Sequence, residues 1–278
     1  MATATGIDEL VAWRAQMDAS LRADDGWLAL AGLFWLDEGA NTFGSGADCD
    51  LVFPEGTCPV LLGTFHRTGD EVRMELATGV EAAVDGRPVE GSVPLRHDDG
   101  GPGTPEIVTV GRLAFHVLVR GPRVGIRLRD HDSAVRAAFT GRAWFEPDPA
   151  AVVSARFERF PEGTTIPITN VLGDTEDNPS PGRVHFRLAG TDCSMDAVAS
   201  GKQLFFIFRD RTNGDSTYGA GRFLYVPVPP GDTVTLDFNR AVSPPCAFTV
   251  HATCPLAPAQ NHLPVAVEAG ERHDGDHH

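Results

Sequence analysis

The stretch that decides the fold is the closing part of the chain, which reads Asp-Phe-Asn-Arg-Ala (237–241), Pro-Pro-Cys-Ala-Phe (244–248), Thr-Cys-Pro (253–255) and Ala-Gly-Glu (269–271). Apolar and polar residues do not alternate cleanly in it, so it is not an ordinary strand. Proline fixes φ and restrains the residue before it, and this stretch contains several prolines. We therefore expect its backbone direction to be fixed so that it positions polar side chains.

Length and composition favour a β-rich chain with two modest domains or one large one. The 278 residues are 42% hydrophobic, and the 30 glycines and 21 prolines are typical of many short strands joined by turns. No apolar run approaches the roughly 20 residues of a membrane helix, and the first residues lack the features of a signal peptide. We expect a cytoplasmic location without membrane contact. The net charge of −15 argues against a nucleic-acid partner.

One amphipathic helix is predicted near the N-terminus. Within residues 7–23, Leu10, Trp13, Met17 and Leu21 recur at helical spacing, as expected of a helix that packs one face on a β domain. The predicted organisation is an N-terminal helix (1–25), a β-sandwich (26–130), a second β domain with the candidate site (131–272) and a disordered tail (273–278).

Short β-like runs separated by turn residues fill the rest of the chain. The runs in the first series are 28–35, 42–43, 50–53, 61–67, 72–76, 82–84, 107–110, 113–119 and 124–128. Those in the second series are 152–160, 165–171, 184–188, 203–209, 221–226, 233–238 and 247–251. The polar stretch 173–181 is predicted to be an exposed loop.

The first series resembles a known sandwich family. Phe-Gly-Ser (43–45), Cys-Asp-Leu-Val-Phe-Pro (49–54), Leu-Gly-Thr-Phe (62–65) and Val-Asp-Gly (84–86) follow the layout of forkhead-associated domains. Members of that family bind phosphothreonine through an Arg, a Ser and an Asn in their loops, and Ser45 stands where the Arg would be. The resemblance implies a β-sandwich.

The chain also resembles a second family, and this resemblance spans nearly its whole length. The residues that carry the resemblance are Gly26–Leu36, Phe205–Thr212, Thr217–Leu224, the stretches 237–241 and 244–248, and Ala-Thr-Cys-Pro-Leu (252–256). They look like a widespread microbial family that is catalogued only as a domain of unknown function. The resemblance implies a shared fold and no established activity.

A first group of candidate residues lies around a predicted hairpin. The turn after the run 203–209 contains Asp210 and Thr212, and the returning strand contains Thr217, Tyr218 and Arg222. A hairpin would bring Asp210 or Thr212 near Thr217 or Tyr218. A Tyr hydroxyl near an Arg can polarise a carbonyl or hold a carboxylate. The structural alternative is that these polar groups satisfy the backbone of the turn.

A second group contains Asp237, Asn239 and Arg240. If the strand continues through these positions, Asp237 and Asn239 share one face, about 7 Å apart, and Phe238 and Arg240 share the other. The pair could bind a polyol, an amide or a cation. Alternatively, the two side chains bond the backbone of the Pro-Pro elbow.

The cysteines and histidines of the closing stretch form a third group. Cys246 and Cys254 are separated by seven residues, and the histidines are not paired, whereas zinc sites use closely spaced ligands. A Cys246–His251 nucleophile and base, a disulfide across the loop, and buried structural thiols all remain open. No metal ligand is assigned, and the pattern names no cofactor.

Taken together, the residues predict an all-β chain with an N-terminal helix, in which a forkhead-associated-like β-sandwich is followed by a second β-sandwich or barrel-like domain. The expected function is the binding of a small polar or anionic metabolite in the C-terminal domain. The domain could also process this metabolite, for example by hydrolysis. The alternatives are an interaction module acting through the sandwich, and a Cys/His-based metal or thiol enzyme; enzymatic activity and oligomeric state stay open. The candidate catalytic residues are Asp210, Tyr218, Arg222, Asp237 and Cys246, and the candidate ligand-binding residues are Thr212, Thr217, Asn239, Arg240 and Asn261.

Overall fold

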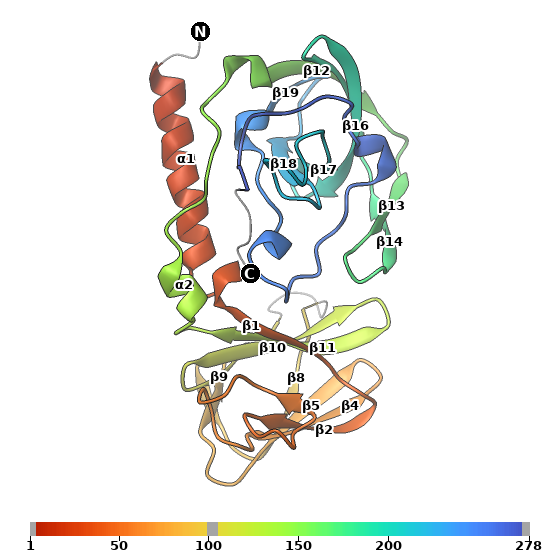
Figure 1. Cartoon of the computed structure of the whole chain (residues 1–278). Helices are drawn as coiled ribbons and strands as arrows, with labels where there is room; N and C mark the ends of the chain where they lie inside the picture. The colour runs from red at the N-terminus through yellow and green to blue at the C-terminus, as the bar shows by residue number, and fades with distance from the viewer. Residues whose placement is uncertain (1–3, 99–104, 274–278) are drawn as a thin grey trace. The chain divides into compact units, whose positions relative to one another are not determined.

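The computed structural model describes residues 4–98 and 105–273, which fold into two compact units (Figure 1). Residues 20–98 and 105–139 form the sandwich unit, and residues 4–19 and 140–273 form the C-terminal unit. The division thus assigns most of the N-terminal helix to the same unit as the closing stretch. Apart from His273, the predicted tail lies outside the described residues.

The sandwich unit consists of a six-stranded sheet, in the order β1-β11-β10-β9-β6-β7, and a five-stranded sheet, in the order β3-β2-β4-β5-β8. Alternating side chains of both sheets enter one core, where Phe43, Phe65 and Phe115 pack with ring centroids 4.1–5.9 Å apart. The strands are β1 (Leu30–Trp35), β2 (Gly39–Gly44), β3 (Leu51–Val52), β4 (Gly63–Thr68), β5 (Glu71–Leu76), β6 (Ala82–Val84), β7 (Arg87–Val89), β8 (Ser92–Leu95), β9 (Val108–Val110), β10 (Leu113–Arg120) and β11 (Arg123–Asp130). The unit also contains η1 (Trp27–Ala29) and α2 (Ala134–Ala138).

The C-terminal unit is built on a six-stranded sheet in the order β18-β17-β16-β15-β12-β19, with a separate β13-β14 ribbon. The helix α1 (Ala4–Arg22) brings Trp13 and Met17 against a small core of this unit, where Trp13 meets Trp144 edge to face at 5.7 Å. The strands are β12 (Val152–Arg159), β13 (Thr165–Thr169), β14 (Thr175–Pro179), β15 (Gly182–Leu188), β16 (Thr191–Ser200), β17 (Gln203–Phe208), β18 (Arg222–Pro227) and β19 (Thr233–Asp237). Short turns are η2 (Pro149–Ala151), η3 (Phe238–Arg240), η4 (Pro245–Ala247) and η5 (Ala259–Asn261).

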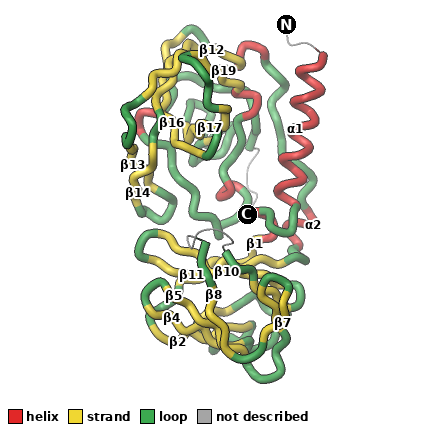
Figure 2. Tube along the Cα trace, turned by 180° about the vertical axis from the view of Figure 1, so that it is seen from behind, coloured by secondary structure: helices red, strands yellow, loops and turns green. Residues whose placement is uncertain are grey.

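The chain after β19 contains no further strand among the described residues, and Figures 1 and 2 show it as loop interrupted by short helical turns. Its last part nevertheless alternates like a strand, because Leu263, Val265, Val267 and Ala269 are buried in the main core and the residues between them are exposed. We call residues 238–273 the closing segment. Among the described residues it pairs with the sheet at isolated bridges, such as Val242 with Phe223, and not as a continuous strand. The rest of its backbone therefore needs other hydrogen-bond partners.

These elements confirm the predicted fold class: an all-β chain with an N-terminal helix and a sandwich followed by a second β domain. Three local predictions were wrong. The stretch 173–181 contains β14, whose polar residues pair with β13 in an exposed ribbon. The run 247–251 is not a strand, because Pro244 and Pro245 start a 3-10 turn there. The strand β19 ends at Asp237, and a 3-10 turn follows it. Asp237 and Asn239 therefore do not share a strand face as predicted.

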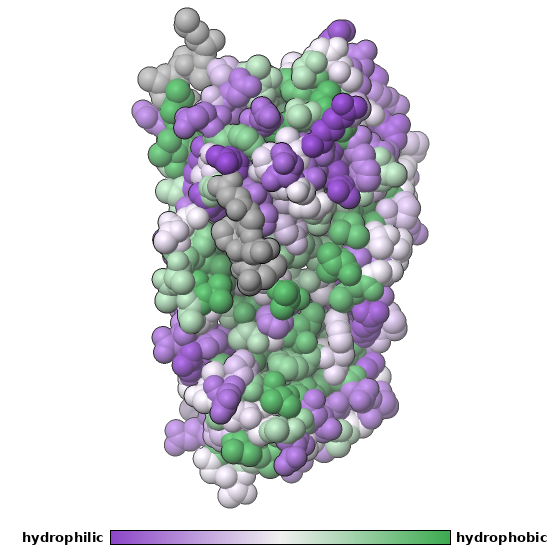
Figure 3. Space-filling model, viewed as in Figure 1, coloured by the Kyte–Doolittle hydropathy of each residue, from purple (hydrophilic) through white to green (hydrophobic). Residues whose placement is uncertain are grey.

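Apolar and charged side chains are interspersed on the molecular surface, as Figure 3 shows for one face. Val60 in the sandwich unit and Val250 in the C-terminal unit are about three-quarters exposed, at 72% and 74%. Among the described residues, no helix is both long and apolar enough to cross a membrane.

Candidate functional site

Arg222 and Asp210, two predicted catalytic residues, form an ion pair in the interior. Arg222 Nη2 lies 2.8 Å from Asp210 Oδ2, and both side chains are fully buried. Arg222 also donates to the carbonyl oxygens of Val267 and Ala269, while the Val267 N–H donates to Asp210 Oδ1 at 3.2 Å. The pair therefore supplies the hydrogen bonds that a neighbouring strand would have given to the closing segment.

The predicted contact across the hairpin is present. Thr212 Oγ1 and Thr217 Oγ1 lie 2.8 Å apart, and the Thr212 N–H donates to Asp210 Oδ1 at 2.9 Å. Both threonines are buried. The polar groups of this turn satisfy one another, which matches the structural alternative.

Asp237, Asn239 and Arg240 anchor the turn that follows β19. The Asn239 side chain accepts from the Asp148 N–H at 2.8 Å and donates to the Asp148 carbonyl oxygen at 2.9 Å, while Asp237 caps η3 by accepting from the Asn239 N–H. The Arg240 guanidinium lies over the Trp13 ring at 5.1 Å. These side chains connect distant parts of the unit. Asn239 bonds the backbone of Asp148 and not, as one alternative predicted, the backbone of the Pro-Pro elbow.

Asn261, a predicted ligand-binding residue, also bonds backbone. Its side-chain oxygen accepts from the Asp196 N–H at 2.7 Å, and its amide donates to the carbonyl oxygens of Asp196 and Ile207 at 2.9 Å each. The residue is 1% exposed. It ties the closing segment to the six-stranded sheet.

Tyr218 and Cys246, the remaining two candidate catalytic residues, do lie together. The Tyr218 hydroxyl donates to the Cys246 carbonyl oxygen at 2.9 Å, and the Cys246 N–H donates to Cys254 Sγ at 3.1 Å. The thiol of Cys254, with a smaller contribution from Tyr218, lowers the pKa of the Cys246 thiol from 9.0 to about 7, while burial opposes the change. Burial raises the pKa of Tyr218.

A buried Arg142–Glu271 pair lies close by, and sequence reasoning did not select it. Arg142 Nε is 3.6 Å from Glu271 Oε2, and only 5% and 3% of the two side chains are exposed. The Ser243 N–H donates to the same carboxylate oxygen at 2.8 Å. Burial raises the pKa of Glu271 from 4.5 to about 7, although Arg142 and Ser243 act in the opposite direction.

Several polar atoms of this cluster lack a hydrogen-bond partner within the described part of the chain. They are Arg142 Nε and Nη1, Arg222 Nε and Ser243 Oγ, all of which are buried. Buried donors of this kind are uncommon, and each calls for an explanation. Glu271 stood in the quoted Ala-Gly-Glu motif, but its burial depends on the tertiary course of the closing segment.

The closing segment connects the two clusters. Arg142 lies over the ring of Phe248 at 5.2 Å, two residues after Cys246. The ring of His273, two residues after Glu271, contacts the ring of Tyr218 at 5.1 Å. We refer to Arg142, Tyr218, Ser243, Cys246, Cys254 and Glu271 together as the closing-segment site.

The described residues contain no group of three or more His, Cys, Asp or Glu side chains arranged to hold a metal ion. All five thiols are unbridged. Burial lowers the pKa of the His251 side chain, and the backbone N–H of His251 donates to Thr249 Oγ1 at 3.2 Å. The structure thus gives no direct contact between His251 and the Cys246 thiol, and the proposed nucleophile and base pair stays a prediction.

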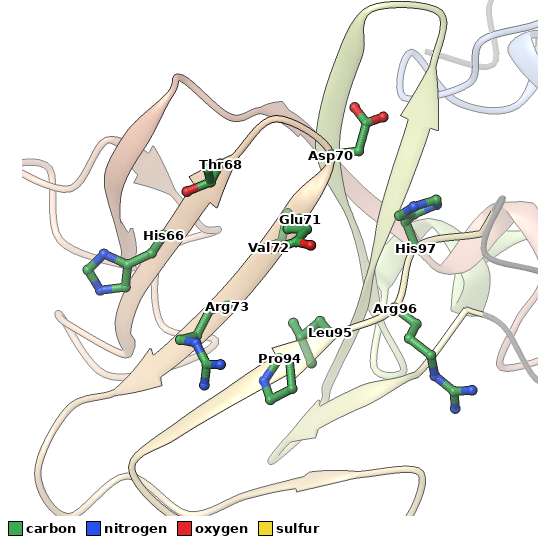
Figure 4. Close-up of a pocket in the computed structure, with 10 residues that line it drawn as sticks. All are labelled: His66, Thr68, Asp70, Glu71, Val72, Arg73, Pro94, Leu95, Arg96 and His97. Atoms are coloured by element: carbon green, nitrogen blue, oxygen red, sulfur yellow. The ribbon is translucent and has the colours of Figure 1, made fainter.

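The sandwich unit has a separate concave surface of about 510 Å³ on strands β4, β5 and β8 (Figure 4). Its lining includes the side chains of His66, Arg73 and Pro94, which face one another across the three strands in register. The surface carries both charges, with Asp70 and Glu71 at the turn between β4 and β5. Arg73 is exposed and forms no ion pair with any described residue.

Comparisons with solved structures returned proteins similar to parts of this chain. An uncharacterized protein of Haloarcula marismortui, solved by NMR in solution, is 34% identical over 50% of this chain and 80% of its own, with a TM-score of 0.42. The FhaA forkhead-associated domain, solved with the intracellular domain of another protein, is 16% identical over 35% of this chain and 97% of its own, with a TM-score of 0.25. A forkhead-associated domain from a study of phosphothreonine-dependent interactions is 17% identical over 36% of this chain and 94% of its own, with a TM-score of 0.24.

No curated protein matches the chain. The model of one protein family matches residues 137–272, a range that begins shortly before Arg142, ends just after Glu271 and contains the whole closing-segment site. The family is described as "protein of unknown function (DUF1684)". Residues 137–272, just under half of the chain, therefore belong to this family.

Proposed function

We propose that the C-terminal unit binds a small anionic metabolite at the closing-segment site, with Arg142 as the anion-binding group. The observation that carries the proposal is the buried Arg142 guanidinium: within the described structure its Nη1 has no hydrogen-bond partner, and its Nε meets the Glu271 carboxylate at 3.6 Å, beyond hydrogen-bond distance. A guanidinium with free N–H groups matches the geometry of a carboxylate or a phosphate. The Ser243 hydroxyl, which adjoins the Glu271 carboxylate without a well-formed hydrogen bond, adds a neutral donor.

Glu271 determines when Arg142 is free to bind an anion. The charged groups around Glu271 are Arg142 and, more weakly, Arg222, and the Ser243 N–H also faces it. When Glu271 is ionised, it competes with a ligand for Arg142. When it is protonated, this competition ends, so protonation of Glu271 and anion binding favour each other. With a pKa of about 7 for Glu271, the site responds to pH in the neutral range.

The first experiment measures the binding of acetate and of inorganic phosphate by calorimetry. Because binding requires protonated Glu271, the affinity of the preferred anion is expected to fall about tenfold between pH 6 and pH 8. Glu271→Gln mimics the protonated acid and should bind with the wild-type pH 6 affinity at both pH values. A preference for acetate over phosphate would identify a carboxylate ligand.

Arginine variants provide the control for this experiment. Arg142→Met should lose at least tenfold in affinity, and Ser243→Ala should lose less. Arg156→Met, at an arginine whose side chain is 62% exposed, should bind like the wild type. Equal binding by wild type and Arg142→Met, or no binding of either anion at pH 6, would rule the proposal out.

A second function, interaction with an acidic partner through the sandwich unit, is favoured by the concave surface on β4, β5 and β8. Arg73 lies in the middle of this surface, exposed and without an ion-pair partner, and can pair with a carboxylate. It thereby offers a positively charged contact on a protein whose net charge is −15. A glutamate-rich peptide should bind wild type, and Arg73→Glu should weaken binding at least tenfold. Arg87→Glu, at an exposed arginine on β7, is the matched control; equal losses in the two variants would indicate non-specific attraction.

A further inference from the structure

The two cysteines of the closing segment differ from the other thiols of the chain. Cys246 and Cys254 lie on the same Pro-rich loop, and the Cys246 backbone N–H is 3.1 Å from Cys254 Sγ. The nitrogen and Cα of one residue are about 1.5 Å apart, so the Cys254 sulfur lies within ~4.6 Å of the Cys246 Cα. The Cys254 sulfur is thus held close to the backbone of the residue whose thiol it would join in a disulfide.

The surroundings of Cys246 favour its reactive form. The Cys254 thiol, the Tyr218 hydroxyl and the backbone N–H groups are the polar groups that face Cys246, and none of them carries a negative charge when Cys254 is protonated. The pKa of Cys246 is consequently lowered to about 7. Burial raises the pKa of the Cys58 and Cys193 thiols instead. Because the thiolate is the reacting species, Cys246 should react first.

From this geometry we infer that Cys246 and Cys254 are a redox-active dithiol, which hydroperoxides convert into an intramolecular disulfide. The Cys246 thiolate attacks the terminal oxygen of the hydroperoxide, so that an S–O bond forms and the O–O bond breaks; the leaving group is the alkoxide, or hydroxide when the oxidant is hydrogen peroxide. The sulfur of Cys254 then attacks the resulting sulfenic acid, forming the S–S bond and releasing water. Overall, two thiols and one hydroperoxide give one disulfide, one water and one alcohol, or a second water when the oxidant is hydrogen peroxide.

The disulfide would be formed within the loop that supports the closing-segment site. The loop between the two cysteines contains Phe248, on which the Arg142 guanidinium lies, and the carbonyl oxygen that accepts from Tyr218 belongs to Cys246 itself. Oxidation would therefore act on the packing of Arg142 and Tyr218. This inference does not depend on the proposed anion binding, because it is tested by the chemistry of the thiols alone.

The test treats the full chain with hydrogen peroxide at pH 7 and counts free thiols after denaturation. We expect loss of two of the five thiols, a mass lower by two hydrogens, and a Cys246–Cys254 cross-linked peptide in the digest. Cys193→Ser, which removes a buried thiol elsewhere, should give the same cross-link. Cys254→Ser should accumulate a sulfenic acid at Cys246 that dimedone traps. Cys246→Ser should form neither the cross-link nor the trapped sulfenic acid.

The pH dependence of alkylation supplies a readout that needs no variant. In the wild type, iodoacetamide should label Cys246 before the other cysteines, and the rate should rise with an apparent pKa of about 7. The inference is overturned if Cys49, Cys58 or Cys193 is oxidised or alkylated before Cys246, or if peroxide leaves all five thiols free.

Discussion

Replacing Arg222 with alanine is expected to lower the free energy of unfolding by about 3–5 kcal/mol, because it leaves the carboxylate of Asp210 buried without its partner. The substitution also removes the donors to the Val267 and Ala269 carbonyl oxygens, which attach the closing segment to the core. Urea denaturation followed by fluorescence would measure the loss.

The exposed Arg211→Ala serves as the matched control and should change stability by less than about 0.5 kcal/mol. In the double variant Arg222→Ala/Asp210→Ala, the loss should be smaller than the sum of the single losses, because the two side chains interact directly. An unchanged unfolding curve for Arg222→Ala would contradict this structural role and return Arg222 to the group of candidate catalytic residues.

The second large effect is a loss of stability with rising pH that originates from Glu271. Its pKa is about 7 in the folded protein and near 4.5 in the unfolded chain, so between these values the folded protein holds a proton that the unfolded chain has released. Stability therefore falls as pH rises, by about 1.4 kcal/mol per pH unit and by about 3 kcal/mol in total. The contribution is fully present below pH 4.5 and lost above pH 7.

The difference in unfolding free energy between wild type and Glu271→Gln, measured from pH 5 to pH 8, isolates this effect. Other titrating groups are common to both proteins, and their contributions cancel in the difference. The exposed Glu268→Gln should show no such pH-dependent difference from wild type. A wild-type-minus-variant difference that does not change with pH would show that Glu271 does not titrate in this range.

Local sequence was enough to predict the two β domains and the N-terminal helix. Alternation with period two identifies strands such as β5, in which Val72 and Met74 are buried and the residues between them are exposed. It was insufficient for β14, because none of the residues of that strand is buried and so no alternation of apolar and polar residues arises. The long strand β16 was missed because four consecutive residues, 195–198, are buried, so its pattern does not alternate, and its Thr, Asp and Ser residues break up the apolar run.

The sequence by itself also identified polar residues that matter, and it brought Thr212 next to Thr217 through the hairpin, which is a local contact. Only the tertiary structure decided what these residues do. Around residues 267–269 the closing segment runs past the sheet without strand pairing, so Arg222 and Asp210 satisfy its backbone there. The Asn261 side chain instead bonds the backbone of the sheet. The Arg142–Glu271 pair joins residues 129 positions apart, and no periodicity links positions so distant. Burial, which gives Glu271 its raised pKa, is likewise a property of the assembled core and not of the local sequence.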